Sequence, residues 1–181
     1  MTTASKITML RIALIPVYFI VMLLDFSGNT WVALAIFIIA SVTDSIDGHI
    51  ARKYNQISDF GKFIDPLADK LLVIAAILIF VQRGQMASWA AMVIITREFA
   101  VTGLRLIAVE NGVVIAAARS GKIKTVVSLV GLCLMMTPWH DASIIGGFDL
   151  DWLVVVLMLI TTVWSGVEYF AKNGKLLNLK K

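Results

Sequence analysis

Six long apolar stretches alternate with short polar segments along the 181 residues of the chain. They cover residues 7–25, 30–52, 61–82, 86–108, 121–138 and 149–170. A helix of about 20 apolar residues is long enough to cross the hydrocarbon core of a bilayer. Buried backbone in lipid must satisfy its own hydrogen bonds, and the stretches show no period-two alternation, so the pattern predicts helices rather than strands. We therefore expect an all-α integral membrane protein with six transmembrane helices.

Composition agrees with this interpretation. Hydrophobic residues make up 59% of the chain and charged residues 15%, against about a quarter charged in a typical soluble domain. The first apolar run meets Asp25 without a small-residue cleavage site, so we expect it to be retained as a membrane span. The connections are short, which predicts a single membrane domain over residues 1–181. No nucleic-acid partner is expected.

The basic residues predict the orientation of the spans. Those that fall at one side are Lys6, Arg11, Arg52, Lys53, Lys62, Arg119, Lys122, Lys124, Lys172, Lys175, Lys180 and Lys181. The opposite side carries Arg83 alone, with Asp25, Asp141, Asp149 and Asp151. Because short cytoplasmic segments are enriched in Lys and Arg, we expect the basic side, and with it both termini, to be cytoplasmic.

An acidic stretch lies between the second and third spans, on the same side. Asp44 and Asp47 are three residues apart, and Asp65 and Asp69 are four apart, so each pair shares one face of a helix. The short connection favours antiparallel neighbouring helices, whose carboxylates would then converge. Convergent carboxylates repel one another unless a cation lies between them. Oxygen-only ligands favour Mg²⁺, Mn²⁺ or Ca²⁺.

The residues around these aspartates suit a diphosphate. Gly48, Ala51 and Gly61 remove bulk beside the carboxylates, and Arg52 offers a fixed cation to phosphate oxygens. Carboxylates, a metal, an arginine and small residues together can bind a diphosphate and stabilise the charge that develops when it is cleaved.

The full spacing is Asp44-x2-Asp47-Gly48-x2-Ala51-Arg52-x8-Gly61-x3-Asp65-x3-Asp69. It resembles the signature of the CDP-alcohol phosphatidyltransferase family at every fixed position. The resemblance implies that an alcohol displaces CMP from a CDP-linked lipid by attack on the β-phosphorus. It implies that the four aspartates hold two divalent metal ions, Mg²⁺ or Mn²⁺. It also implies that Asp69 is the catalytic base. Residues implied to bind the CDP-lipid are Gly48, Ala51, Arg52, Ser58, Gly61, Thr8 and Arg11.

Two further stretches bear on the acceptor alcohol. "TREFAVTGLRLIA" (96–108) places Arg97, Glu98 and Arg105 in an apolar helix, where ionisable groups are costly unless paired or hydrated. "ARSGKIKT" (118–125) adds Arg119, Lys122 and Lys124. The spacing allows a bridge between Glu98 and Arg105.

These residues predict a basic pocket for an acceptor that carries its own phosphate. The preferred candidates for binding this phosphate are Arg119 and Lys122, followed by Arg105 and Arg97, with Lys124 as a further candidate. Both stretches are similar to the glycerol-3-phosphate-using branch of the family. The implied substrates are CDP-diacylglycerol and sn-glycerol 3-phosphate, handled at the cytoplasmic face of the cell membrane by a multi-pass protein in contact with membrane lipid. The family also suggests a homodimer.

Other functions fit part of the pattern. Within the family, the acceptor could be inositol phosphate, serine, or phosphatidylglycerol as in a cardiolipin synthase. From another class, a membrane prenyltransferase or a divalent-cation carrier could use the same carboxylates. A prenyltransferase should show a second Asp-rich motif and more spans, and the chain has one Asp-rich block.

Overall fold

The fold is seen in a computed structural model. It describes the backbone of residues 3–53, 59–113, 115, 118–140, 143–145 and 148–174. Within these ranges, the side chains of 3–8, 44–53, 59–69, 110, 143–145 and 148 lie outside the description.

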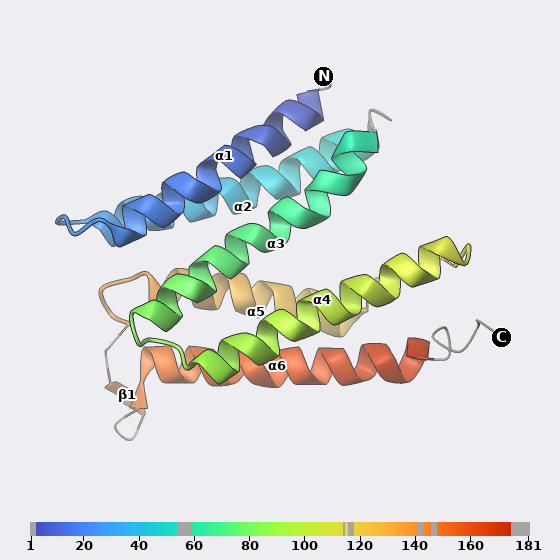
Figure 1. Cartoon of the computed structure of the whole chain (residues 1–181). Coiled ribbons are helices and arrows are strands. Elements are labelled where there is room, and N and C mark those ends of the chain that lie inside the picture. Colours follow the sequence, from blue (N-terminus) through green and yellow to red (C-terminus); the bar gives the residue numbers. More distant parts are fainter. Residues whose placement is uncertain are drawn as a thin grey trace.

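Six helices build the described part of the chain, as the hydrophobic pattern predicts (Figure 1). They are α1 (Thr3–Leu23), α2 (Asn29–Lys53), α3 (Asp59–Gln82), α4 (Ser88–Glu110), α5 (Arg119–Met135) and α6 (Leu150–Asn173). Every predicted stretch contains one of them, with shifts of a few residues at the ends. A small hairpin, β1 (Ser143–Ile145) with β2 (Phe148–Asp149), joins α5 to α6. The apolar pattern predicts helices rather than strands, and this hairpin is too short to give a two-residue periodicity.

The helices form two groups of three. In one group α1 packs along α2 and α3, and in the other α6 packs along α5 and α4. The groups meet where α3 contacts α4 and α5, and where α2 contacts α5. Figure 1 shows the first group above the second, with successive helices running in opposite directions. As a result, α2 ends, α3 begins, α4 ends and α5 begins at one end of the bundle, which also holds the start of α1 and the end of α6.

A shared apolar core joins the helices. Its fully buried members include Tyr18 on α1, Phe37 on α2, Phe80 on α3, Ile94 on α4 and Met158 on α6. At Gly131 on α5 the approach to α6 is so close that an added Cβ would lie 2.7 Å from Val154 Cγ1. The lack of a side chain at this position is therefore what allows α5 to pack closely on α6.

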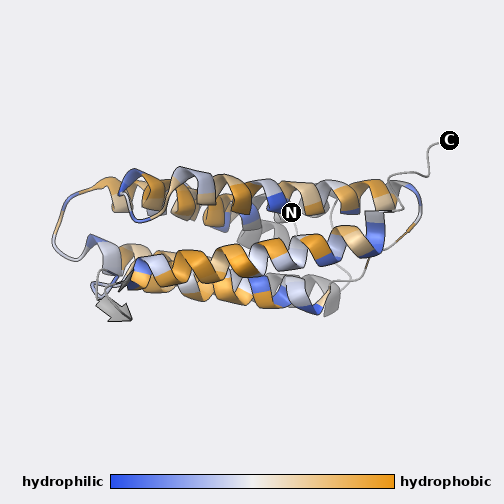
Figure 2. Cartoon of the chain, turned by 90° about the horizontal axis from the view of Figure 1, so that it is seen from below, coloured by the Kyte–Doolittle hydropathy of each residue, from blue (hydrophilic) through white to orange (hydrophobic). Residues whose placement is uncertain are grey.

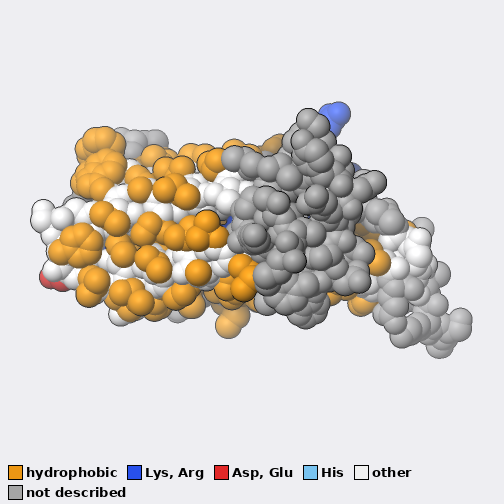
Figure 3. Space-filling view, turned by 90° about the horizontal axis from the view of Figure 1, so that it is seen from above, with side chains coloured by type: hydrophobic (Ala, Val, Ile, Leu, Met, Phe, Trp, Pro, Cys, Tyr) orange, Lys and Arg blue, Asp and Glu red, His pale blue; other side chains and the backbone are white. Residues whose placement is uncertain are grey.

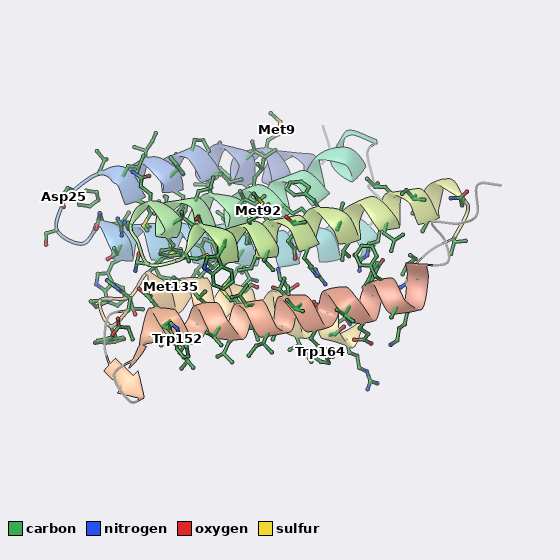
Figure 4. All side chains as sticks on the ribbon, turned by 60° about the horizontal axis from the view of Figure 1, so that its bottom comes forward. Met9, Asp25, Met92, Met135, Trp152 and Trp164 are labelled. Atoms are coloured by element: carbon green, nitrogen blue, oxygen red, sulfur yellow. The ribbon has the colours of Figure 1, made fainter. Side chains whose placement is uncertain are left out.

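Many large apolar side chains face outward from the bundle. Leu106 on α4 is 67% exposed and Met92 is 66% exposed. Trp152 and Trp164 on α6 point away from the bundle, whereas Met135 on α5 is buried in it (Figure 4). Apolar residues run along most of the length of the helices (Figure 2), and they are spread over the described part of the face seen from above (Figure 3). Such an extensive apolar surface is abnormal for a protein in water and normal for one in lipid.

Among the residues that the structure describes, α6 is the helix that is long and apolar enough to cross a membrane. Shorter apolar stretches occupy Met9–Leu23, Asn29–Thr43 and Lys70–Gln82. The structure thus gives six helices with apolar outer surfaces.

Hydrogen bonds tie the connections together at the end of the bundle remote from the α2–α3 connection. Arg83 donates to the carbonyl of Met22 at 2.6 Å, linking the end of α3 to the end of α1. Asp151, at the start of α6, accepts a hydrogen bond from Gln85 at 3.0 Å and lies 3.1 Å from His140 Nδ1. These contacts fix the α1–α2, α3–α4 and α5–α6 connections relative to one another at this end of the bundle.

Candidate active site

A cavity of about 730 Å³ opens between the two groups of helices. All six helices contribute to its wall, from Arg11 on α1 and Ser41 on α2 to Tyr169 on α6. Its charged residues approach the bundle end where α2 ends and α3 begins. The cavity is therefore next to the helix segments that carry the Asp-rich signature.

The wall of this cavity is strongly basic. Six cationic side chains among the described residues line it, namely Arg11, Lys70, Arg97, Arg105, Lys122 and Lys124. One described acidic residue, Glu98, lies among them. Because charges inside an apolar bundle are costly unless paired or solvated, the excess of Arg97, Arg105, Lys122 and Lys124 over Glu98 in the described wall indicates a binding site for an anion.

Glu98 on α4 lies at the centre of the charged wall. Its Oε1 atom lies 2.9 Å from Arg97 Nη1 and 2.6 Å from Lys124 Nζ on α5. The side chain of Lys124 is 5% exposed and that of Arg97 is 13% exposed, against 21% for Glu98. The carboxylate thus neutralises part of the positive charge and ties α4 to α5.

Two of the other cations, Arg105 and Lys70, contact polar neighbours. Arg105 Nε donates to the hydroxyl of Tyr169 at 3.0 Å, and its guanidinium lies 5.5 Å from the centre of the same ring. Lys70 on α3 donates to Thr102 Oγ1, and Thr102 in turn donates to the carbonyl of Glu98 at 2.8 Å. These contacts connect α3 and α6 to α4 and give the cations defined positions, which is what selective binding of an anion requires.

Some buried polar atoms of the wall have no hydrogen-bond partner among the described residues. They include the hydroxyls of Ser41 and Ser128 and the Nε atom of Arg97. Nearly all buried polar groups in folded proteins are satisfied by protein or water. The unsatisfied groups of this wall are therefore available to a ligand or to water.

The Asp-rich signature lies on the helix segments that border the cavity. Asp44 and Asp47 belong to the last part of α2, and Asp65 and Asp69 to the first part of α3. The two helices are antiparallel neighbours, as expected, so both segments lie at the same end of the bundle (Figure 1). The side chains of these aspartates, and of Thr8, Gly48, Ala51, Arg52 and Gly61, lie outside the described residues, as does the whole of Ser58.

The donor set of the signature fits a divalent cation, because four carboxylates and no sulfur or imidazole partner are what Mg²⁺ and Mn²⁺ prefer. Within the part of the chain whose side chains are described, no group of three or more His, Cys, Asp or Glu could hold a metal.

The predicted phosphate-binding residues differ in their placement. Arg97, Arg105, Lys122 and Lys124 line the cavity, whereas Arg119, the first residue of α5, is exposed and does not. Arg11 also lines it and is 1% exposed. The bridge between Glu98 and Arg105 does not form: seven residues are about two turns, or roughly 10 Å along the helix, and Arg97 and Lys124 are nearer to the carboxylate.

Lys70, Thr102 and Tyr169 are among the wall residues that the sequence pattern did not single out. Lys70 gave a usable signal, because a lysine inside an apolar span usually faces a polar cavity. Thr102 and Tyr169 gave none, since neither a lone threonine nor a tyrosine near a helix end distinguishes a cavity wall from an interfacial position.

Comparisons with known proteins agree with the geometry. The family model described as CDP-alcohol phosphatidyltransferase matches residues 1–164. A Bacillus subtilis protein named CDP-diacylglycerol--glycerol-3-phosphate 3-phosphatidyltransferase is 45% identical, over 96% of this chain and 95% of its own length. A Mycobacterium tuberculosis protein named probable phosphatidylglycerophosphate synthase is 35% identical over 93% of this chain and 80% of its own.

A Haemophilus influenzae protein with the same name as the Bacillus relative is 33% identical, over 96% of this chain and 95% of its own. The match to the family model covers the Asp-rich signature and nearly all of the cavity wall. The chain therefore belongs to the CDP-alcohol phosphatidyltransferase family.

Proposed function

We propose that this chain is a membrane enzyme that transfers the phosphatidyl group of CDP-diacylglycerol to sn-glycerol 3-phosphate. The products are phosphatidylglycerophosphate and CMP, and the pathway is phospholipid biosynthesis. The observation that carries the proposal is a cavity with six cations in its described wall, beside the helix ends that hold the Asp-rich signature. The names of the relatives point to the same two substrates.

The charge of the cavity favours an acceptor that carries a phosphate. Serine has no net charge, so it would not offset the excess of Arg97, Arg105, Lys122 and Lys124 over Glu98 in the described wall. A phosphomonoester brings about two negative charges and several strong acceptor oxygens. Lys124, Arg97 and Arg105 are the proposed ligands of this phosphate, because they line the cavity and are fixed by partners. Lys122 would complete the site, and Arg119 would act from its rim.

The donor site is proposed at the Asp-rich signature. Asp44, Asp47, Asp65 and Asp69 would hold Mg²⁺ or Mn²⁺, as two ions. When bound, these ions would supply positive charge that offsets the negative charge developing on the departing CMP. Gly48, Ala51 and Gly61 would give the diphosphate access to the backbone, while Arg52 and Arg11 bind its oxygens. Ser58 and Thr8 are proposed as further contacts to the CDP part.

The transfer exchanges one phosphorus–oxygen bond for another. The acceptor hydroxyl oxygen forms a bond to the β-phosphorus, and the bond from that phosphorus to the oxygen of CMP breaks. Asp69 accepts the proton that the hydroxyl loses. The cations of the cavity hold the acceptor so that its hydroxyl faces the phosphorus, which replaces a chance encounter by a fixed geometry.

Six membrane spans, with both termini and the active site at the cytoplasmic face of the cell membrane, complete the proposal. It is supported by the apolar outer surface of the helices and by the concentration of Lys and Arg at one end. Tags at the two ends should both be protected from protease added outside intact cells, and cleavage of either one would refute this topology. A homodimer is also proposed, to be tested by the mass of the detergent-solubilised protein.

The function is tested by measuring CMP release by the purified protein from CDP-diacylglycerol in mixed micelles, with one alcohol at a time. Glycerol 3-phosphate should support release, and serine, inositol phosphate and phosphatidylglycerol should give little. CMP release with one of these alcohols and none with glycerol 3-phosphate would show that glycerol 3-phosphate is not the acceptor. Metal flux into liposomes in the absence of CDP-lipid would instead indicate a carrier.

A further inference from the structure

A carboxylate in the middle of a phosphate-binding wall needs an explanation. Glu98 lines the cavity together with the six cations, and its negative charge opposes the binding of any anion there. It is also the residue that contacts the two most buried of the cations whose ion pairs the structure describes, Lys124 and Arg97. A cavity selected for phosphate alone would bind it more tightly without this carboxylate.

The two oxygens of Glu98 are used differently. Both ionic contacts, at 2.6 Å to Lys124 and 2.9 Å to Arg97, engage Oε1. Oε2 has no hydrogen-bond or ionic partner among the residues that the structure describes. Glu98 is more exposed to the cavity than either cation, at 21%. Its second oxygen is therefore a strong hydrogen-bond acceptor directly beside two phosphate ligands.

An acceptor can use this arrangement if it carries a hydroxyl close to its phosphate. Glycerol 3-phosphate has its phosphate on one end carbon, a hydroxyl on the middle carbon and the reacting hydroxyl on the other end. With the phosphate on Lys124 and Arg97, the middle hydroxyl would lie within reach of the neighbours of these cations, and Glu98 is the carboxylate that contacts both of them. The hydroxyl would donate to Oε2, with no covalent change.

Resting on the function proposed above, we propose that Glu98 is the specificity-determining residue for the acceptor. Its Oε2 atom accepts a hydrogen bond from the hydroxyl on the carbon next to the phosphate-bearing carbon. A site that is built to bind a substrate hydroxyl rejects the analogue without it, since its own polar group then loses its partner in the complex. The two cations keep Glu98 ionised, so the hydrogen bond it accepts is a charge-assisted one.

The test compares two acceptors, glycerol 3-phosphate and 3-hydroxypropyl phosphate, which keeps the phosphate and the reacting hydroxyl and lacks the middle one. For each, kcat/KM is measured with the full-length enzyme in CDP-diacylglycerol micelles. The native enzyme should prefer glycerol 3-phosphate by about tenfold or more. Glu98→Ala should reduce the preference to near unity, mainly by losing activity with glycerol 3-phosphate. Glu98→Gln should keep part of the preference, because its amide oxygen can still accept a hydrogen bond.

A matched control is Glu168→Gln, which changes a carboxylate on α6 that pairs with Lys172 at 2.5 Å and does not line the cavity. It should leave the acceptor preference unchanged. An unchanged KM for CDP-diacylglycerol will show that each variant is folded, and Glu98→Gln serves in place of Glu98→Ala if the latter is not.

The outcomes separate this inference from the function beneath it. Equal losses with both acceptors in the Glu98 variants would mean that Glu98 only neutralises its cationic neighbours, which overturns the inference and leaves the function intact. A native enzyme with equal kcat/KM for the two acceptors would also overturn the inference and leave the function intact. A native enzyme that releases no CMP with glycerol 3-phosphate would overturn both.

Discussion

Lys124 Nζ on α5 lies 2.6 Å from Glu98 Oε1 on α4, and this ion pair forms part of the wall of the basic cavity. Neither side chain is at the surface: Lys124 is 5% exposed and Glu98 is 21% exposed. A lysine at this depth is usually paired or close to a bound anion, because an isolated ammonium is costly in an apolar bundle. With Arg97 on the same carboxylate, the three groups retain one net positive charge for a ligand.

Lys124→Gln should raise the KM for glycerol 3-phosphate by about tenfold to a hundredfold, because a hydrogen bond to a charged group contributes about 1.5–3 kcal/mol. The KM for CDP-diacylglycerol should change little, since the proposed donor site is at the Asp-rich signature. Steady-state kinetics with each substrate varied in turn will measure both values.

The control for this variant is Lys172→Gln, which alters a lysine on α6 that is 66% exposed and lies outside the cavity. Arg119→Ala should have a smaller effect than Lys124→Gln, because Arg119 is exposed and does not line the cavity. An equal rise in both KM values for Lys124→Gln would point to a role in folding rather than in acceptor binding.

Asp69→Asn should reduce kcat by about two to four orders of magnitude, the range expected when a general base is removed. The amide cannot take the proton of the acceptor hydroxyl, whereas three of the proposed metal-binding carboxylates remain. Binding of CDP-diacylglycerol, measured by equilibrium titration in micelles, should therefore be largely retained. A variant with nearly native turnover would exclude Asp69 as the base.

Removal of divalent cations should abolish activity. Without a cation, the four aspartates of the signature would repel one another and the diphosphate. Dialysis against a chelator should stop CMP release, and Mg²⁺ or Mn²⁺ should restore it, whereas K⁺ at the same ionic strength should not. Full turnover in the presence of excess chelator would contradict the metal-dependent mechanism.

Gly131→Ala should destabilise the protein, because the new Cβ would lie 2.7 Å from Val154 Cγ1 in the contact between α5 and α6. Overpacking of this kind typically costs about 1–3 kcal/mol. The matched variant is Gly103→Ala on α4, where no described atom lies within 4 Å of the added Cβ. Thermal unfolding in detergent should show a lower midpoint for Gly131→Ala and an unchanged or higher one for Gly103→Ala.

The helical part of the fold could be predicted because lipid imposes a strong constraint on sequence. A long apolar stretch must be helical, so six stretches gave six helices, and α2 and α3 are antiparallel neighbours as the short connection implied. The hairpin of β1 and β2 could not be predicted, because five strand residues show no periodicity.

The site was predictable only in part. Charged residues inside apolar stretches pointed to a cavity, and Arg97, Arg105, Lys122 and Lys124 do line one. The ion pairs within the cavity could not be deduced from the sequence. Glu98 pairs with Arg97 and Lys124 rather than with Arg105, and its contact with Lys124 depends on how α4 and α5 pack. The same holds for Tyr169, which reaches Arg105 from a helix 64 residues away in sequence.

The central claim is the transfer of a phosphatidyl group to glycerol 3-phosphate. The most direct measurement is the incorporation of radiolabelled glycerol 3-phosphate into chloroform-soluble lipid by the purified protein with CDP-diacylglycerol and Mg²⁺ or Mn²⁺. We predict that labelled lipid appears in a one-to-one ratio with released CMP, and that it requires both the CDP-lipid and the metal. CMP release without labelled lipid, or labelled lipid without CDP-diacylglycerol, would contradict the claim.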